Sequence, residues 1–462
     1  MKFAIIGGGW AGMAAAQTLV EAGHDITVFE AAAIAGGRAR GVPDSDLVNI
    51  DNGQHILIGA YTETLKLIHK AHPAPELVLT RLPLQWLAAD GSIRIQSHQT
   101  HAGPLKRLSA FTQAQGLSRR ERWQLVTWLS KVRLGFASPS AGQTVHQWLD
   151  QHHIDPASRD KLITPLCLAT LNTTPQNACA QLFARVIQDS LLSPLPGAAD
   201  MLIARSNLTD LWIGPLARNL TLRTSKRIRD IELTDQHAQI DGETFDGAIV
   251  ATTPHETSRL LQTTSHHAAS DPYLNNIIEA AQSLTYNSIT TCYMTLDQPW
   301  RLPNSILLLS GGHPKTDTTT QPQQSIQVQQ PLQPGQWVFD RNAFLPKDLV
   351  TESAQLSFVI SHADQAVTFE RSELPTQLLA QLKADLQRNG HTVPDKLSIR
   401  TSRILSDRRA TFAAQPGLQR PSVHTDWPHL KIAGDWTNTG YPAVLEGAIL
   451  SGQEAAQALL SE

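Results

Sequence analysis

Short apolar runs and spaced glycines alternate along the first thirty residues in the order of a nucleotide-binding unit. Residues 2–6 form an apolar run suited to a buried parallel strand, and a helical stretch at 13–22 follows the glycine-rich segment 7–12. A second apolar run at 26–29 ends at Glu30. Strand, glycine turn, helix and strand in this order predict a Rossmann-like unit. A secretory signal peptide is disfavoured, because consecutive glycines would break its helical apolar core.

The remaining pattern divides the chain into segments that interleave two domains. Residues 81–204 are mostly helical in periodicity, whereas residues 263–420 mix strand-like runs with one long helical stretch. A Gln-rich stretch at 318–336 cannot bury a core and predicts a loop. Strand-like alternation between these blocks, and a strand followed by a helix at the C-terminus, would return the chain to the nucleotide-binding unit. We therefore assign segments 1–80, 205–262 and 421–462 to a nucleotide-binding domain, and segments 81–204 and 263–420 to a substrate domain.

The composition excludes several classes of protein. With 462 residues, 41% of them hydrophobic and 17% charged, the chain has the make-up of a globular protein. Its net charge of −3 provides no overall field for nucleic acid. The three cysteines, Cys167, Cys179 and Cys292, lack metal-ligand spacing, so we expect no disulfide framework, no metal and a reducing cytoplasm. No apolar run reaches the roughly 18 residues that a spanning helix needs.

The glycine segment carries the first candidate chemistry. Gly7 permits a tight turn, Gly9 lets the backbone approach a pyrophosphate, and Gly12 lets the helix pack on the strand. The N–H groups at the helix N-terminus can bind the phosphates. The carboxylate of Glu30 can accept hydrogen bonds from ribose hydroxyls. This context predicts a bound dinucleotide, whereas a glycine motif alone would be a much weaker signal.

Features at both ends of the chain indicate that the dinucleotide is FAD. Gly37 and Arg38 follow the ribose acid, where they could return a cation and a backbone amide to the pyrophosphate. Near the C-terminus a strand runs into Asp435, which could bind the ribitol chain, and a helix beginning near Val444 could stabilise negative charge on the flavin. Taken singly, three positions have plainer interpretations: a surface cation at Arg38, a helix cap at Asp435 and a solvated helix position at Glu446. Because these features occur together in this order along the chain, we expect an FAD-binding protein. We expect its fold to be of the α/β class, with a Rossmann-like FAD-binding domain and an interleaved α+β substrate domain.

Longer stretches resemble a known superfamily. The chain resembles the flavin-dependent amine oxidase and phytoene desaturase superfamily in AIIGGGWAG near its N-terminus and IAGDWTNTGYPAVLEGAILSGQEAA near its C-terminus. Within that superfamily it is similar to the hydroxysqualene dehydroxylases, or squalene-associated FAD-dependent desaturases, in PLCLATLNT at 165–173, QLFARVIQDSL at 181–191 and GQWVFDR at 335–341. The resemblance covers nearly the full length. It implies reductive removal of the hydroxyl group of hydroxysqualene to give squalene, in hopanoid or related triterpene biosynthesis. Val444 stands where amine oxidases commonly carry an aromatic residue, which disfavours amine oxidation.

By position, the resemblance also implies which residues bind FAD. The turn at 53–56 would line the isoalloxazine, and the backbone of Val444 and Leu445 would face its pyrimidine edge. Ile228, in the strand pattern 225–231, would be the backbone contact to adenine. The implied FAD-binding residues are Gly7, Gly9, Trp10, Ala11, Gly12, Glu30, Ala31, Gly37, Arg38, Gly53, Gln54, His55, Ile56, Ile228, Gly434, Asp435, Val444 and Leu445.

The implied reaction needs a proton donor and a dry pocket. An allylic hydroxyl leaves poorly as hydroxide, so a general acid should protonate it while positive charge spreads over the neighbouring double bond and reduced FAD supplies hydride. An apolar pocket for a C30 isoprenoid would keep water from the cation. His55 is the first candidate for the acid, because its turn lies near the flavin and imidazole titrates in the right range. It could equally hold its loop by hydrogen bonds. Tyr441 and Asp51 are rivals, and Asp51 could simply cap the turn.

A basic stretch at 106–136 could bring the protein to a membrane-dissolved substrate. It contains seven cations against one acid, Glu121, and apolar residues recur at helical spacing beside Trp123. We therefore expect a cytoplasmic protein with a peripheral contact at the inner face of the cell membrane. A core-packing helix with a solvated charged face is the alternative. The cations are Lys106, Arg107, Arg119, Arg120, Arg122, Lys131 and Arg133, and the apolar residues are Leu125, Trp128, Leu129, Val132 and Phe136.

Two other functions fit the same fold. Rab escort and GDP-dissociation-inhibitor proteins resemble this superfamily and carry prenyl lipids without using flavin, but they lose the FAD-binding residues, which are all present here. A carotenoid or other polyprenoid desaturase would move hydride from its substrate to oxidised FAD. Since one flavin can run both ways, the sequence leaves the direction open. It also leaves open which electron donor a reductive reaction would use.

Overall fold

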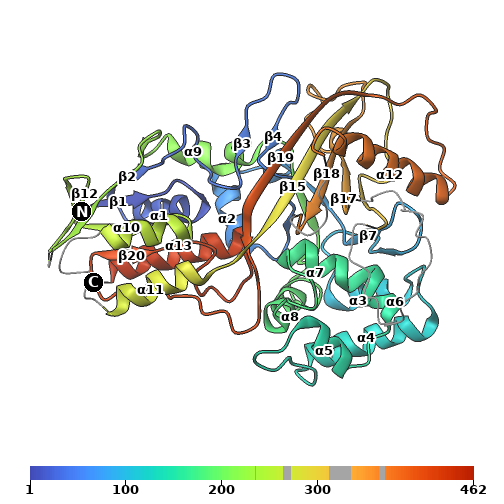
Figure 1. Ribbon diagram of the computed structural model, residues 1–462, viewed down its shortest axis with the longest axis horizontal. Helices are drawn as coiled ribbons and strands as arrows, with labels where there is room; N and C mark the ends of the chain where they lie inside the picture. Colours follow the sequence, from blue (N-terminus) through green and yellow to red (C-terminus); the bar gives the residue numbers. More distant parts are fainter. Residues whose placement is uncertain (235, 264–271, 312–333, 364–369, 462) are drawn as a thin grey trace.

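A parallel sheet built from strands far apart in sequence forms one end of the molecule. The computed structural model describes residues 1–234, 236–263, 272–311, 334–363 and 370–461 (Figure 1), so residues 318–333 of the Gln-rich stretch lie outside the described part. The sheet has the order β10-β2-β1-β14-β20. Its strands are β1 (Lys2–Ile6), β2 (Asp25–Phe29), β10 (Thr221–Arg223), β14 (Gly247–Val250) and β20 (Leu430–Ile432). Its central strands are buried on both faces, as a parallel sheet requires.

Helices from both ends of the chain pack together beside this sheet. The first, α1 (Trp10–Glu21), contacts the last, α13 (Leu445–Leu460). A Cβ at Gly452 would collide with the carbonyl oxygen of Ala11, so only glycine allows the two helices to approach so closely. The other helices near this sheet in Figure 1 are α2 (Thr62–Ala71), α9 (Gly214–Ala217), α10 (Pro254–Thr263) and α11 (Pro272–Ser283), with a π-helix at Thr209–Ile213.

A second, antiparallel sheet has the order β16-β17-β18-β15-β19. Its strands are β15 (Tyr286–Leu296), β16 (Ile306–Leu308), β17 (Trp337–Asp340), β18 (Gln355–Ser361) and β19 (Ile399–Phe412), with a 3-10 helix at Arg341–Ala343. The helix α12 (Leu374–Arg388) covers one face, where its leucines pack against Phe358 and Ile360. The long strands β15 and β19 run side by side towards the parallel sheet (Figure 1), and β19 forms an edge.

A helical block occupies the side of the molecule away from both chain ends (Figure 1). Its helices are α3 (Pro104–Thr112), α4 (Arg119–Arg133), α5 (Val145–Gln151), α6 (Pro156–Ser158), α7 (Thr164–Leu171) and α8 (Ala180–Asp189), with a π-helix at Arg159–Ile163. Ser118 begins α4 with a capping box to Glu121, which satisfies free N–H groups at the helix start. Inside the block Trp128 and Trp148 meet edge to face, with 4.9 Å between ring centroids.

The predicted strand pattern at 225–231 is wrong. Residues 224–230 connect β10 to β11 without strand pairing, because Asp241 accepts hydrogen bonds from the N–H groups of Arg229 and Asp230 and holds this segment as a loop. Ile228 lies in that loop with its side chain buried. The remaining short strands are β3 (Gly41–Val42), β4 (Ile50–Asp51), β5 (Leu57–Ile58), β6 (Leu79–Leu82), β7 (Gln85–Leu87), β8 (Arg94–Gln96), β9 (Met201–Ala204), β11 (Ile231–Leu233), β12 (Ala238–Ile240) and β13 (Glu243–Phe245), and a 3-10 helix spans Pro75–Leu77.

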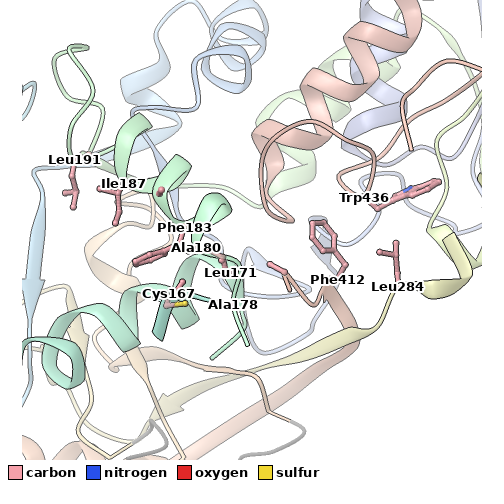
Figure 2. Close-up of a cluster of buried hydrophobic side chains, with 14 of the residues drawn as sticks. Cys167, Leu171, Ala178, Ala180, Phe183, Ile187, Leu191, Leu284, Phe412 and Trp436 are labelled. Atoms are coloured by element: carbon pink, nitrogen blue, oxygen red, sulfur yellow. The ribbon is translucent and has the colours of Figure 1, made fainter. Parts of the chain in front are cut away.

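One continuous apolar cluster joins the helical block to the parallel sheet. Figure 2 shows part of it, with Phe183 and Ile187 of α8 on one side and Phe412, Leu284 and Trp436 on the other. All of these side chains are nearly inaccessible to solvent. Burial of these apolar side chains stabilises the arrangement of the helical block relative to the sheets.

Candidate cofactor and active site

The glycine turn after β1 leaves the N-terminus of α1 free to bind an anion. Gly7 has a φ of +109°, which only glycine adopts readily. A Cβ on Gly12 would collide with the carbonyl oxygen of Gly7, so this glycine permits close packing of helix on strand. Gly9 is the N-cap residue and makes no side-chain cap, and a Cβ there would find only the Cα of Gly37 within 4 Å. The free N–H groups of the first turn therefore face an open approach.

A second glycine loop lies directly on the first. The N–H of Gly36 donates to the carbonyl of Gly8 at 2.8 Å, and Gly36 and Gly37 both adopt positive φ. Glu30 ties the two loops together, because its carboxylate accepts hydrogen bonds from the N–H groups of Gly8 and Ala32 at 2.8 and 2.7 Å. Ala31 lies between these contacts. The binding of ribose by Glu30 stays a prediction.

The neighbouring side chains of α1 are held from outside the helix. The indole Nε1 of Trp10 donates to the carbonyl of Ala39 at 2.8 Å, and the Trp10 ring packs edge to face on Trp212. The backbone carbonyl of Ala11 packs against Gly452 of α13. These contacts fix the helix start relative to the second glycine loop.

Arg38 and Asp435 meet although 397 positions separate them. The Arg38 guanidinium donates to the Asp435 carboxylate at 2.6 Å and to the carbonyl of Ala410 in β19 at 2.7 Å. Burial acts to lower the pKa of Arg38, but the Asp435 carboxylate holds that pKa above its ordinary value. Asp435 follows β20 after Gly434, whose φ of +155° and close approach to Trp436 leave no room for a Cβ. Arg38 is therefore an ion-paired cation whose side chain stays 35% exposed, and the helix-cap interpretation of Asp435 is wrong because Val444 is the N-cap of α13.

The turn at 53–56 lies against the antiparallel sheet. The Gln54 N–H donates to Thr291 Oγ1 of β15 at 3.3 Å, and Gln54 Oε1 accepts from Ser357 Oγ of β18 at 2.9 Å. A Cβ on Gly53 would lie 3.6 Å from Thr291 Oγ1, in ordinary contact distance. Ile56 packs against the central apolar cluster. The turn therefore packs on strands β15 and β18 of the antiparallel sheet.

His55 is held as a neutral imidazole. Its Nδ1 lies 2.7 Å from the carbonyl oxygen of Gly53, so Nδ1 carries the proton and Nε2 is left as an acceptor. Burial lowers the pKa of His55, and the positive charge of Arg38 adds to that effect against the opposing bond to Gly53. A neutral imidazole with its proton bonded to the backbone can accept a proton or orient a hydroxyl group.

The pKa of Asp51 is shifted in the opposite direction to that of His55. Burial raises its pKa to about 7, against the effects of the Leu208 N–H, which donates to Oδ1 at 2.7 Å, and of Arg341. The Tyr293 hydroxyl donates to the Asp51 carbonyl at 3.1 Å, and Arg341 lies over the Tyr293 ring. Near neutral pH this carboxyl therefore divides between its protonated and ionised forms.

A small cavity joins Asp51 to His55. Its volume of about 30 Å³ is enough for one water molecule. Arg205 also lines it, and the buried Nε of Arg205 finds no hydrogen-bond partner among the residues that the structure describes. The polar walls and the unsatisfied donor favour a bound water in this cavity. Its lining includes Asn49, Asp51, Gln54, His55, Arg205, Tyr293, Arg341, Phe344 and Leu345.

Tyr441 is committed to a contact with α8. Its hydroxyl donates to Asp189 at 2.6 Å and accepts from Arg185 at 3.0 Å, and burial together with Asp189 raises its pKa. These bonds hold the loop before α13 against the helical block. The proton of Tyr441 is therefore engaged in a structural hydrogen bond.

The N-terminus of α13 presents free backbone groups, as that of α1 does. Val444 is its N-cap and makes no side-chain cap, and Leu445 is its first residue. Glu446, in the same turn, is buried and accepts hydrogen bonds from Glu63 N, Thr64 N and Thr64 Oγ1 at 2.7–2.9 Å. It caps α2, so its interpretation as a solvated position is wrong. No local sequence signal marks this role, because the partners lie more than 380 residues earlier.

Sequence reasoning also missed a buried amide network at the end of α7. Asn172, with a φ of +48°, donates to Thr411 Oγ1 at 3.0 Å and accepts from the His362 N–H at 2.6 Å. Asn287 donates to the Asn172 carbonyl at 2.6 Å. The network joins the segment 165–173 to strands β15 and β19 of the antiparallel sheet and to the residue that follows β18. The only sequence signal was the similarity of that segment to a family.

The arrangement fits FAD. Two helix N-termini without side-chain caps, two glycine loops in contact and the Arg38–Asp435 pair converge from three distant chain segments. Phosphates suit the first helix end, and the negative edge of a flavin suits the second. Ile228 is a loop residue whose carbonyl accepts from Arg259 at 2.7 Å, and its contact with adenine stays a prediction. Among the described residues, no helix is long and apolar enough to cross a membrane and no group of side chains has the make-up of a metal site.

Comparisons with known proteins give the family. A sequence profile described as flavin containing amine oxidoreductase matches residues 10–460. A hydroxysqualene dehydroxylase of Rhodopseudomonas palustris is 26% identical, covering 99% of this chain and 98% of that protein, and one of Zymomonas mobilis is 25% identical over the same shares. A zeta-carotene desaturase of Synechocystis is 23% identical, covering 100% of this chain and 97% of that protein.

Solved structures share the fold. A putrescine oxidase bound to putrescine superposes with a TM-score of 0.67 at 14% identity, with full coverage of both chains. A putative protoporphyrinogen oxidase from Exiguobacterium gives 0.64 at 17% identity, covering 100% of this chain and 99% of that one. These likenesses confirm the predicted α/β fold. Because the family profile spans nearly the whole chain, this protein belongs to the flavin containing amine oxidoreductase family and is an FAD-dependent oxidoreductase.

Proposed function

We propose that this enzyme removes the hydroxyl group of hydroxysqualene to give squalene, a step of hopanoid or related triterpene biosynthesis. The observation that carries the proposal is the full-length similarity, at 25–26% identity, to proteins named hydroxysqualene dehydroxylase. The segments 165–173 and 181–191 contribute buried apolar side chains to the cluster in Figure 2. An apolar surround of this kind would keep water from a cationic centre on a C30 isoprenoid.

The proton for the departing oxygen is assigned to Asp51. Bound FAD would supply the hydride that replaces that oxygen. Asp51, with a pKa raised to about 7, retains protonated carboxyl at neutral pH, and the water-sized cavity connects it to His55. His55 has no proton to give through Nε2, so its role is to orient the water or the hydroxyl group. The adjacent glycine turn and the Arg38–Asp435 pair would hold the cofactor.

A membrane contact at one end of the α3–α4 pair would give access to the substrate. Leu105, Leu134 and Phe136 have side chains 67–79% exposed, which is unusual for such large apolar groups. Lys106, Lys131 and Arg133 accompany them, so this end, which we call the apolar tip, combines inserting side chains with cations for an anionic bilayer such as the inner face of the cell membrane. The helices α3 and α4 lie on the side away from the parallel sheet (Figure 1).

Arg107 does not belong to that cationic surface. It is 1% exposed and donates to the carbonyls of Ala102, Leu191 and Leu195. Burial, opposed by Asp200 and aided by nearby Arg133, lowers its pKa. The proximity to Arg133 indicates that the start of α3 lies near the end of α4, which brings the members of the tip together.

A polyprenoid desaturase is the second candidate function. The full-length similarity to a zeta-carotene desaturase at 23% identity supports it. It would use the same fold and the same cofactor with hydride moving from the substrate to the flavin. The set of FAD-binding features disfavours a non-catalytic lipid carrier.

The deciding experiment follows both the flavin and the product without oxygen. Enzyme reduced with dithionite should reoxidise its FAD when hydroxysqualene is added, and mass analysis should find squalene. Deuterium placed at flavin N5 should appear in the product at the carbon that lost oxygen or at the far end of the allyl system. Squalene added to oxidised enzyme should leave the flavin spectrum unchanged. If oxidised enzyme instead dehydrogenates a polyprenoid and leaves hydroxysqualene untouched, the desaturase function replaces the dehydroxylase.

A further inference from the structure

Reductive dehydroxylation needs electrons that the residues of the site cannot supply. Converting an alcohol and two protons to a hydrocarbon and water consumes two electrons per turnover, and a bound flavin only passes them on. An external reductant must therefore approach the cofactor in every cycle. The protein surface near the cofactor must therefore have a place where this reductant can bind.

An open groove lies beside the turn that is proposed to hold the isoalloxazine. Its volume is about 520 Å³, within the range of ligand and partner clefts. Asn52, the neighbour of Gly53, forms one wall, and residues 402–406 of β19 with the segment before α12 form the other. Its lining is polar and includes Ser372, Ser402 and Ser406 together with Arg371 and Arg403.

Beyond the groove, the free edge of β19 runs on to the residues that contact Arg38. Arg371 donates to the carbonyl of Ile404 at 2.7 Å, and six residues further along Arg38 donates to the carbonyl of Ala410. Both carbonyls accept from outside the sheet, since β19 is an edge strand. One edge thus connects the groove with the Arg38–Asp435 pair.

Arginines outnumber acids along this edge, in a protein of net negative charge. Arg400, Arg403, Arg408 and Arg409 are all exposed on β19, against Asp407 on the same strand and two acids that face it, Asp44 and Asp297. Among the residues that the structure describes, the ion pair of Arg403 is a long one with Asp44, 3.9 Å between nitrogen and oxygen. Arginines on an edge strand can simply prevent unwanted strand pairing. Arg403 lines the groove beside Asn52, and the other three arginines follow along the same strand, which favours a second purpose.

We propose that the groove and the arginines of β19 form the docking surface for an acidic electron-carrier protein that reduces the bound FAD. The inference rests on the proposed reductive function, because a desaturase would need an oxidant instead. Two carrier molecules would deliver one electron each and solvent would supply two protons. Both electrons would leave in the new C–H bond of the product, and the hydroxyl oxygen would leave as water. Complementary charge would raise the association rate and make it fall with salt.

Stopped-flow mixing with a reduced acidic flavodoxin tests this docking surface. The second-order rate of FAD reduction should fall steeply between low and high salt in the wild type. The charge reversals Arg403→Glu and Arg408→Glu together should lower that rate by about tenfold or more at low salt. Calorimetric affinity for oxidised flavodoxin should fall in parallel, which gives a readout independent of turnover. A matched control, Arg119→Glu with Arg120→Glu on α4, makes the same charge change elsewhere and should leave both quantities near wild type.

Failure of the docking surface can be distinguished from failure of the proposed function. Dithionite needs no docking surface, so dithionite-driven conversion of hydroxysqualene should be unchanged in the β19 variant. A wild type that flavodoxin fails to reduce, a β19 variant that it reduces as fast as the wild type, or direct reduction by NADPH would each overturn the docking proposal. If dithionite-reduced wild type leaves hydroxysqualene unchanged, the dehydroxylase function fails instead, while flavodoxin affinity still reports on the surface.

Discussion

Asp51 illustrates how a single carboxyl can serve both folding and chemistry. Its Oδ1 accepts from the Leu208 N–H, which fixes the segment after β9, while burial raises its pKa to about 7. Asparagine is nearly isosteric and its amide oxygen can still accept that hydrogen bond. The Asp51→Asn variant therefore removes the proton with little disturbance of the fold.

We expect the pH dependence of dehydroxylation to report on Asp51. Because the folded-state pKa is raised, the carboxyl is protonated below about pH 7 and the wild-type rate should fall as pH rises through that value. Asp51→Asn should abolish this limb and lower the single-turnover rate by about 10²–10⁴-fold, the usual contribution of a general acid. The measurement is flavin reoxidation after mixing dithionite-reduced enzyme with hydroxysqualene between pH 5.5 and 9.

His55 provides the matched control for that titration. Its Nδ1 proton is engaged with Gly53, so His55→Gln should slow the reaction through poorer orientation and keep the high-pH limb. If the limb survives in Asp51→Asn and disappears in His55→Gln, the proton comes from His55.

At the scale of elements, α4 shows where sequence patterns succeed and where they stop. Its apolar spacing was readable from local sequence. The sequence did not show which of these apolar residues would be buried. In the structure Leu125, Trp128, Leu129 and Val132 are core residues, whereas Trp123 and Phe136 are exposed. Periodicity identifies an apolar face but not what covers it, because the covering elements, such as α8, come from elsewhere in the chain.

The apolar tip can be tested as one element of the surface. Leu105→Ser with Phe136→Ser removes two large exposed apolar groups and should lower partitioning onto anionic liposomes by about tenfold or more, since burying each in the interface contributes up to about 2 kcal/mol. Sedimentation with phosphatidylglycerol-containing vesicles measures this. Trp123→Ser, which removes an exposed aromatic group near the opposite end of α4, should have little effect. If the wild type, the double variant and Trp123→Ser all sediment equally with vesicles, the apolar tip does not bind membranes.

At the scale of the whole molecule, the cofactor site joins parts that no local pattern relates. The glycine turn, the second glycine loop and the strand-helix ends were predictable because each carries its chemistry within a few residues. The Arg38–Asp435 pair, the Glu446 cap on α2 and the cavity between Asp51, Arg205 and Arg341 depend on contacts across much of the chain. Burial also reverses the expected order of the acid candidates, since it raises the pKa of Asp51 and lowers that of His55.

Since FAD would bridge these distant segments, its removal should destabilise the whole protein. A ligand at 100 times its dissociation constant adds about 2.7 kcal/mol to the free energy of unfolding. Gly9→Val should abolish this increment, because its side chain would occupy the approach to the pyrophosphate. The apoprotein should keep nearly its wild-type melting temperature, since a Cβ at Gly9 meets only Gly37 Cα at 3.8 Å and φ there is −75°. Gly12→Val should instead lower the melting temperature of the apoprotein itself, because its Cβ would collide with Gly7. Calorimetry of apo and FAD-loaded forms separates the two effects, and a Gly9→Val protein that retains full flavin absorbance would show that the pyrophosphate lies elsewhere.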